Sequence, residues 1–516
     1  MRSNLVGVIS ALGAAAVLAY TVPAEAFCGF YVGGAGAKMF NHATEVVLMR
    51  HGTTTVLSMQ NNYQGPPEHF ALVVPVPVVI HEDQVKTLDP AVFEKLDTLG
   101  APRLVEYWEQ DPCNPYANDP DRDLSMPSMM AVDEVASEGR DEAEYHVKIE
   151  AKFSVAEYDI VVLSASESTG LQRWLTANQY AIPAGVEPLL RPYVEQGTKF
   201  FVAKVNPKKV RFVNGMATLS PLRFSYESPE LSLPIRLGLA NSAGDQDLIV
   251  NILAPNQRYE VANYPNVTIP TNLAVTDAVR TRFGEFYAAL FDSAIAKVPG
   301  AVVTEYAWDS GSCDPCPGPT LDPSDLATLG ADVIGASYKD VGSYSYTLTR
   351  LHARYGTDVK QDLVFRAVEP ITGGRGLPDE HGAMDTTVHA DGSNNFQGRY
   401  AILHPWTGAL ACPTPTRGRW GGPPDGQQIA TQAASNLAFA PRGNVSLSTL
   451  VAADVPQIGV MASKGSPLPT PVRQPQGCGC DAGSAGGLAG SAATGLGVLG
   501  LVLRGRRRGR RPRTGC

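Results

Sequence analysis

The chain has 516 residues, of which 44% are hydrophobic, so it is long enough to bury a large core. Its net charge is -9, and residues 481–516 contribute +6 while residues 1–26 are neutral, which leaves -15 on the body between them. An acidic surface argues against nucleic acid and anionic lipid as partners.

The N-terminus has the three parts of a secretory signal. Arg2 supplies a positive start, Leu5–Val22 is mostly apolar, and Ala24-Glu25-Ala26 is a small-residue cleavage motif. We therefore expect cleavage between Ala26 and Phe27, and an exported mature chain that begins at Phe27.

Strand patterns dominate the body that follows. Glu45–Arg50 and Thr55–Gln60 flank a turn and predict a hairpin, and Phe70–Ile80 predicts a third strand. Its two prolines, Pro75 and Pro77, favour the edge of a sheet. Similar patterns predict further strands at residues 145–153, 159–164, 210–213, 216–219, 231–239, 247–253, 301–307, 344–353, 362–368 and 398–403.

Helices interrupt these strands without regular alternation. The longest is expected over Asp277–Lys297, with Thr276 as its N-cap. Its apolar face consists of Val279, Phe283, Phe286, Tyr287 and Leu290. Shorter helices are expected at residues 91–99, 169–178 and 186–196, the last weakened by Pro192. The predicted class is α+β: a strand-rich ectodomain with several helices, plus a signal peptide and a C-terminal apolar helix.

Composition also suggests domain boundaries. We expect a signal peptide at 1–26, an ectodomain at 27–425, a flexible stalk at 426–477 and a sorting tail at 478–516. Two stretches inside the ectodomain look non-core: residues 114–144 are acidic and suggest a mobile insertion, and residues 371–395 are rich in glycine and proline without periodicity.

Disulfides are the default state of cysteines outside the cytoplasm. The ectodomain has five candidates, Cys28, Cys113, Cys313, Cys316 and Cys412. Cys313 and Cys316 form a C-x-x-C pair, but Pro317-Gly318-Pro319 prevents a helix from starting there, which disfavours a redox site. We expect both to be oxidised, either to each other or with Cys113 as one partner, leaving Cys412 or Cys28 as the odd thiol.

No metal or cofactor site is predicted, and the catalytic residues are unknown. Asp119–Asp123 has the carboxylate spacing of a calcium loop, but Leu124 and Met130 replace its glycine and glutamate. The His- and Asp-containing segment Glu380–His389 lacks helical spacing, so a surface loop is favoured. Gly34–Lys38 lacks the G-K-[ST] ending of a nucleotide loop.

The C-terminus combines a cysteine pair, an apolar span and a basic end. Cys478 and Cys480 precede Ala482–Leu503, which is followed by seven arginines between Arg504 and Arg513. This order resembles the MYXO-CTERM sorting signal of myxobacteria and relatives. The resemblance implies cleavage by a sorting protease near the cysteines, and anchoring to the membrane through the span or through a lipid on Cys478 or Cys480. The arginines should stay cytoplasmic.

The body resembles a bacterial family of exported proteins named domain of unknown function 2330. The resemblance lies in Phe27–Val32, Tyr63–Pro77, Trp308–Cys316 and Asn395–Tyr400, and it spans roughly residues 27–420. It implies no activity, cofactor or catalytic residue. We favour a surface-anchored binding or structural ectodomain with an unknown extracellular ligand. The alternative is an exported enzyme, either a hydrolase or a thiol–disulfide oxidoreductase that uses Cys313 and Cys316.

Overall fold

The computed structural model describes residues 30–32, 40–64, 71–114, 147–178, 180, 182, 185–213, 216–241, 244–337, 345–423, 431–433, 440, 442–443 and 445–463. These residues belong to the first of two units, Met1–Pro471, and the second is Val472–Cys516. The signal peptide, Cys28, the sorting tail and nearly all of the insertion predicted at 114–144 lie outside the described residues.

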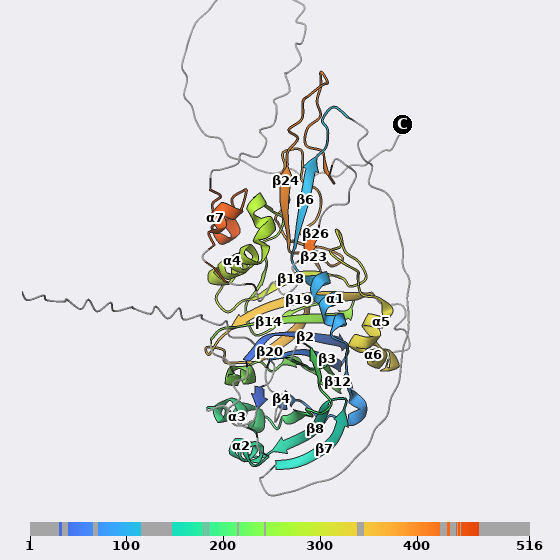
Figure 1. Cartoon of the computed structure of the whole chain (residues 1–516), viewed down its shortest axis with the longest axis vertical. Helices are drawn as coiled ribbons and strands as arrows, with labels where there is room; N and C mark the ends of the chain where they lie inside the picture. Colours follow the sequence, from blue (N-terminus) through green and yellow to red (C-terminus); the bar gives the residue numbers. More distant parts are fainter. Residues whose placement is uncertain are drawn as a thin grey trace, which may run out of the picture. The chain divides into compact units, whose positions relative to one another are not determined.

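The largest sheet has eleven strands and runs across the first unit (Figure 1). In pairing order the path is β22 (His389–Ala390), β21 (Ile371–Gly373), β23 (Asn395–Gln397), β18 (Val302–Asp309), β19 (Tyr346–Tyr355), β14 (Gln246–Pro255), β2 (Phe40–His51), β3 (Thr54–Gln64), β12 (Leu222–Glu227) and β5 (Val85–Thr87), and β16 (Asn266–Thr268) pairs with β18. The predicted hairpin is confirmed, with His51 opposite Thr54 across its turn. β14 is central: it pairs in parallel with β2 and in antiparallel orientation with β19.

A second sheet has five strands and includes the proline-containing strand. Its order is β1 (Phe30–Val32), β4 (Ala71–Val76), β9 (Lys199–Val205), β8 (Tyr158–Ala165) and β7 (Val147–Val155). β4 is therefore an interior strand, and the edge position predicted from Pro75 and Pro77 is wrong. β1 pairs only with Ala71–Val73, so beyond Val73 that side of β4 needs no N–H donor, and Pro77 follows the end of the strand.

Three smaller sheets complete the described part of the chain. They are β13 (Leu231–Leu233), β20 (Leu363–Val368) and β15 (Arg258–Val261); β10 (Arg211–Val213) and β11 (Met216–Thr218); and β17 (Leu273–Val275), β24 (Arg399–His404), β6 (Arg103–Glu109) and β25 (Trp420–Gly421), with β26 (Thr431–Ala433) also on β6. The strand predicted at 231–239 is shorter than expected. It ends at Leu233, because Pro234 follows and a 3-10 helix, η2 (Arg236–Asn241), begins two residues later.

The helices are short apart from one. They are α1 (Ala91–Gly100), α2 (Ser168–Ala177), α3 (Glu187–Glu195), α4 (Phe283–Lys297), α5 (Pro323–Leu326), α6 (Asp332–Ser337) and α7 (Leu447–Leu450), with the short turns η1 (Glu82–Gln84), η3 (Asp277–Thr281), η4 (Ala327–Ala331) and η7 (Pro456–Ile458). At 15 residues, α4 is the longest helix described, as predicted, but it begins at Phe283 instead of Asp277. Arg282 leaves the helical conformation, and the Thr276 hydroxyl donates to Thr449 O and caps no helix.

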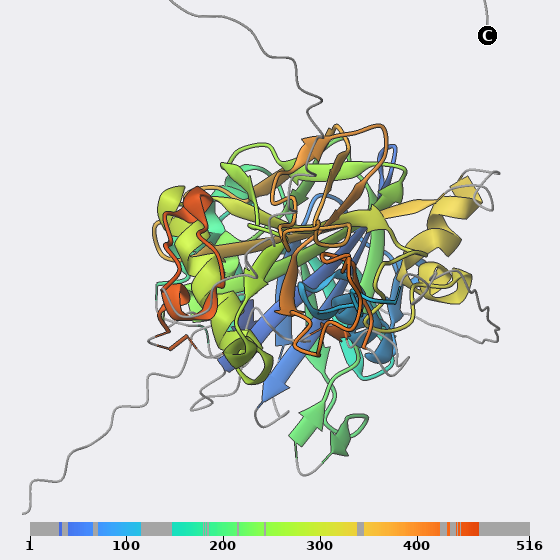
Figure 2. The same cartoon turned by 90° about the horizontal axis from the view of Figure 1, so that it is seen from above.

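Both faces of the large sheet are buried. Along β2, Val46 and Leu48 belong to one apolar cluster, and Val47 and Met49 belong to another, as the two-residue period of a strand requires. The first cluster also contains residues of β4, β8 and β9, and the second contains residues of α1. The pair α4 and α7 and the pair α5 and α6 lie on opposite sides of the first unit (Figures 1 and 2). The structure is thus strand-rich with several helices, a mixed α+β fold.

The segment 445–463 packs on the body, so the flexible stalk predicted over 426–477 is wrong for this part. Leu447, Leu450 and Val451 are buried in the same cluster as Phe286 and Leu290 of α4. Val451 also forms a β-bridge with β17. The apolar residues of this segment are therefore part of the same core as α4.

Candidate functional site

Two disulfides join the four ectodomain cysteines that the structure describes. Cys313 is bonded to Cys316, and Cys113 is bonded to Cys412 across 299 positions of sequence. Of the two candidates for the odd thiol, Cys412 is therefore paired, and the pairing of Cys113 with the C-x-x-C motif does not occur. Cys28, Cys478 and Cys480, like the cleavage residues Ala26 and Phe27, lie outside the described residues.

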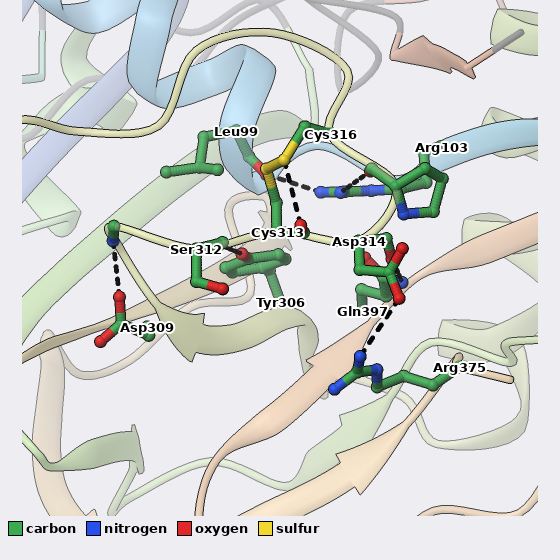
Figure 3. Close-up of a disulfide and its surroundings, with 12 residues drawn as sticks. Leu99, Arg103, Tyr306, Asp309, Ser312, Cys313, Asp314, Cys316, Arg375 and Gln397 are labelled. Atoms are coloured by element: carbon green, nitrogen blue, oxygen red, sulfur yellow. Dashed lines mark hydrogen bonds and ion pairs between the residues drawn. A yellow bond between two sulfur atoms is a disulfide. The ribbon is translucent and has the colours of Figure 1, made fainter. Parts of the chain in front are cut away.

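The loop closed by Cys313 and Cys316 is held through its backbone by side chains from other strands (Figure 3). Arg103 of β6 donates from Nη1 to the Pro315 carbonyl at 3.0 Å, and Gln397 of β23 donates to the Asp314 carbonyl at 2.8 Å. The loop follows β18 directly, and the next helix, α5, begins only at Pro323. No helix N-terminus therefore lies at the cysteine pair, as the prolines predicted.

Beneath this loop, two arginines lie side by side. Arg103 and Arg399 are paired residues on the parallel strands β6 and β24, and only 0% and 3% of their surfaces are exposed. Arg103 also donates to Leu99 O, and Arg399 donates to Asn272, to the Tyr107 hydroxyl and to Gly376 O. Their guanidinium groups stack on aromatic rings, at 5.5 Å from Tyr306 and 5.7 Å from Tyr107.

A third arginine reaches the same place from the surface. Arg375 lies 4.3 Å over the ring of Trp308, and its Nη2 is 3.3 Å from the Asp314 carboxylate (Figure 3). The preceding glycine makes this approach possible, because Gly374 has a φ of 71° and an added Cβ would lie 1.9 Å from Gln397 O. We call Arg103, Arg375 and Arg399 the arginine cluster.

Burial and mutual repulsion act in the same direction on this cluster. Burial lowers the pKa of Arg103 below its usual value, and the charge of Arg399 lowers it further. Burial likewise lowers the pKa of Arg399, with Arg375 adding to the effect. Asp314 is the carboxyl group that opposes both effects, and its side chain is 71% exposed.

A second set of buried charges lies on the large sheet, centred on Glu305. β18 has a bulge between Thr304 and Tyr306, which leaves Glu305 without a partner residue on β19. Its carboxylate, 1% exposed, accepts hydrogen bonds from Arg350 Nε at 2.8 Å and lies 2.7 Å from His352 Nδ1.

The same set continues in both directions along the sheet. Arg350 is also 2.7 Å from Asp97 of α1, and His352 Nε2 is 3.1 Å from Asp247 of β14. Asp247 in turn accepts a hydrogen bond of 2.7 Å from Arg442, which lies just before the segment that packs on α4. We call Asp97, Arg350, Glu305, His352, Asp247 and Arg442 the paired-charge cluster.

The pKa shifts in the paired-charge cluster show that its charges support one another. Burial alone would lower the pKa of His352, but the charges of Glu305 and Asp247 and their hydrogen bonds outweigh burial and raise it. Burial alone would raise the pKa of both carboxyl groups, yet His352 and the neighbouring arginines hold these pKa values below the usual range. The cluster is therefore a structural ion network that joins α1, the sheet and the C-terminal segment.

A smaller polar group lies at Glu106, in the middle of β6. Glu106 accepts two hydrogen bonds from Arg280, at 2.7 and 2.8 Å, and lies 2.7 Å from His404 Nε2. The His404 ring stacks on Trp108 with a centroid distance of 4.5 Å. This arrangement fixes the histidine ring beside the ion pair of Arg280 and Glu106.

Among the described residues, no group of three or more His, Cys, Asp or Glu side chains is arranged so that it could hold a metal ion. In the segment Glu380–His389, His389 pairs with Asp385 at 2.9 Å on the surface, while His381 pairs with Glu380. The calcium-like segment Asp119–Asp123 and the glycine-rich segment Gly34–Lys38 lie outside the described residues. Among the described residues, no helix is long and apolar enough to span a bilayer, and the predicted span Ala482–Leu503 is not among them.

Sequence reasoning missed both charge clusters. Their members are far apart along the chain, and they become neighbours only through strand pairing. One local signal was available: Arg350 and His352 stand at alternate positions of a strand that is otherwise mostly apolar, and charges at inward positions of such a strand require partners.

Comparison with known proteins gives one match. Residues 22–366 match a bacterial family described as "Uncharacterized protein conserved in bacteria (DUF2330)", which covers more than half of the chain. This confirms the family resemblance, although the match ends before Asn395–Tyr400. No curated protein and no solved structure matches the chain.

Proposed function

The chain belongs to this DUF2330 family of uncharacterized bacterial proteins, and we propose that it is an exported, surface-anchored protein whose ectodomain is a binding or structural module. Three features support the proposal: the signal-like N-terminus, the Cys-span-Arg tail, and two disulfides, which persist mainly in oxidising compartments.

The observation that carries the choice of a binding or structural module is the anchoring of the Cys313–Cys316 loop. Buried side chains from two other strands donate hydrogen bonds to its carbonyl groups, at 3.0 Å from Arg103 and 2.8 Å from Gln397. A disulfide in such a setting stabilises a surface loop. It also lacks the helix N-terminus that lowers the pKa of the attacking thiol in many dithiol oxidoreductases.

Mass spectrometry of protein shaved from the cell surface tests export and anchoring. We expect a mature N-terminus at Phe27 and a C-terminus at or near Cys478 or Cys480. Removing Arg504–Arg513 should release or misroute the chain, since these arginines stop translocation. A chain that starts at Met1, or surface peptides that reach Cys516, would contradict the proposal.

The alternative, a thiol–disulfide oxidoreductase, is favoured by one observation: Cys316 is exposed at the surface. Thiol counting and an insulin-reduction assay separate the two functions. The binding or structural module predicts no reactive thiol at Cys313 or Cys316 in native protein, and no reductase activity. Two reactive thiols together with turnover that is lost in the Cys316→Ser variant would establish the enzyme instead.

A further inference from the structure

The arginine cluster lacks the negative charge that buried cations normally require. Among the described residues, no carboxylate oxygen lies within 4.0 Å of the guanidinium nitrogens of Arg103 or Arg399, although both side chains are buried. Instead they donate to backbone carbonyls, an amide and a phenol. Buried charges are usually paired, because an unpaired charge loses its hydration without compensation.

An unpartnered donor lies in the same place. Arg103 Nε is buried and has no hydrogen-bond partner in the described part of the structure. Two like charges at directly paired strand positions also repel each other. The protein therefore contains a positively charged site. Its own residues offset only part of the free-energy cost of burying these arginines.

We propose that the arginine cluster is an oxyanion-binding site for a carboxylate or phosphate group of an extracellular ligand, with the Cys313–Cys316 loop as its cover. The proposal rests on the ectodomain being a binding module. Guanidinium groups offer planar pairs of N–H donors that match the oxygen pairs of both anions.

The entrance to the site is formed by the half-buried Arg375 and the exposed Asp314. The side chain of Arg375 is 32% exposed and stacks on Trp308. Because this stacking already restricts the side chain, little conformational entropy is lost when a ligand binds. The Asp314 carboxylate lies 3.3 Å from Arg375 and occupies the position that a ligand oxyanion would take. Arg103 and Arg399 supply the positive field behind it.

Calorimetric titration of the full chain with inorganic phosphate and with acetate tests this proposal, with potassium chloride at matched ionic strength to remove screening effects. We expect saturable binding of one or both anions. Arg375→Gln should weaken it about tenfold or more, because a charge-assisted hydrogen bond is lost. Asp314→Asn should strengthen it by up to about fivefold, because a competing exposed carboxylate is removed.

Arg366→Gln is the control, since Arg366, like Arg375, lies close to a carboxylate, in its case that of Glu260 at 3.8 Å. It should leave binding unchanged. Preference for phosphate or for acetate assigns the ligand group. Heats equal to those of chloride, or equal affinity in Arg375→Gln and the parent, would overturn the oxyanion site. Such a result would not contradict the proposed binding or structural module, provided that the disulfide is intact and the protein is retained at the surface. Reactive thiols in the native protein would contradict the module itself.

Discussion

Arg350 and Arg103 are both buried arginines on β-strands, but their surroundings differ in charge. Arg350 lies 2.7 Å from Asp97 and 2.8 Å from Glu305. Burial alone would lower its pKa, yet these carboxylates raise it. Arg103 contacts carbonyl oxygens and has a second arginine as its neighbour, and its pKa is lowered by burial and by that neighbour.

The difference separates two uses of a buried charge. A network of paired charges stabilises the contact between elements, because removal of any one partner leaves the others buried without a counter-charge. A cluster of arginines without paired carboxylates can still attract an anionic group from a ligand. Three predictions test whether the two clusters differ in this way, and a fourth tests the disulfide loop that covers the arginine cluster.

The largest effect is expected from Glu305→Gln. The variant should lose about 3–5 kcal/mol of unfolding free energy, because Arg350 and His352 lose their shared buried carboxylate. Urea denaturation measures it. Glu285→Gln on α4 is the control, since its exposed carboxylate pairs only with Arg282 among the described residues, and its midpoint should hardly change. A loss of about 1 kcal/mol or less for Glu305→Gln, as for a surface pair, would mean that the cluster is not a unit.

Replacing both Cys313 and Cys316 by serine should lower the unfolding free energy by about 2–5 kcal/mol, near the lower limit because the bridge closes a short loop. The comparison is made by urea denaturation under non-reducing conditions. Ser312→Ala, in the same loop, serves as the control. A double variant as stable as the parent would rule out a structural role for this disulfide.

Stability should depend on pH through the paired-charge cluster. The raised pKa of His352 contributes stability that is present below about pH 6.5 and is lost as pH rises through the folded pKa. The lowered pKa values of Glu305 and Asp247 contribute stability that is present above about pH 4.3 and is lost as pH falls through their folded pKa values. The contribution of these three groups to stability should therefore be greatest between these limits.

Urea unfolding as a function of pH measures this dependence. Above pH 6.5 the His352 contribution falls by at most about 1.4 kcal/mol per pH unit, the value for one proton. Glu45 also lowers stability as pH rises, starting from about pH 4.3, because burial and the charge of Asp97 raise its pKa. Comparing His352→Gln with its parent in a Glu45→Gln background isolates the histidine. A difference that grows with rising pH would contradict the assigned charge state.

The smallest effect is expected from Arg103→Met. It removes hydrogen bonds to Pro315 O and Leu99 O but also relieves repulsion with Arg399, for a net loss of about 1 kcal/mol. Arg350→Met is the matched variant. It should lower the unfolding free energy by about 3–5 kcal/mol, because it leaves the carboxylates of Asp97 and Glu305 without their buried counter-charge. Equal losses in denaturation experiments would remove the distinction between the clusters.

Most strands could be predicted because their periodicity is local. The hairpin at residues 51–54 and the apolar face of α4 follow from side chains that alternate at the periods of strand and helix. β6 was missed, because Arg103, Glu106 and Glu109 interrupt its apolar residues. Thr276 was misread as a helix N-cap, because a hydroxyl at a helix start looks the same in sequence whether it bonds to its own helix or to Thr449.

The sequence by itself determined the α+β class, the family membership and the absence of a helix start at Cys313–Cys316, since each depends on neighbouring residues or on a shared pattern. Only the tertiary structure decided the disulfide between Cys113 and Cys412, the packing of residues 445–463 on α4, and both charge clusters. Those contacts join residues up to 299 positions apart. Strand order and a bulge at Glu305 select them, and neither leaves a local pattern in the chain.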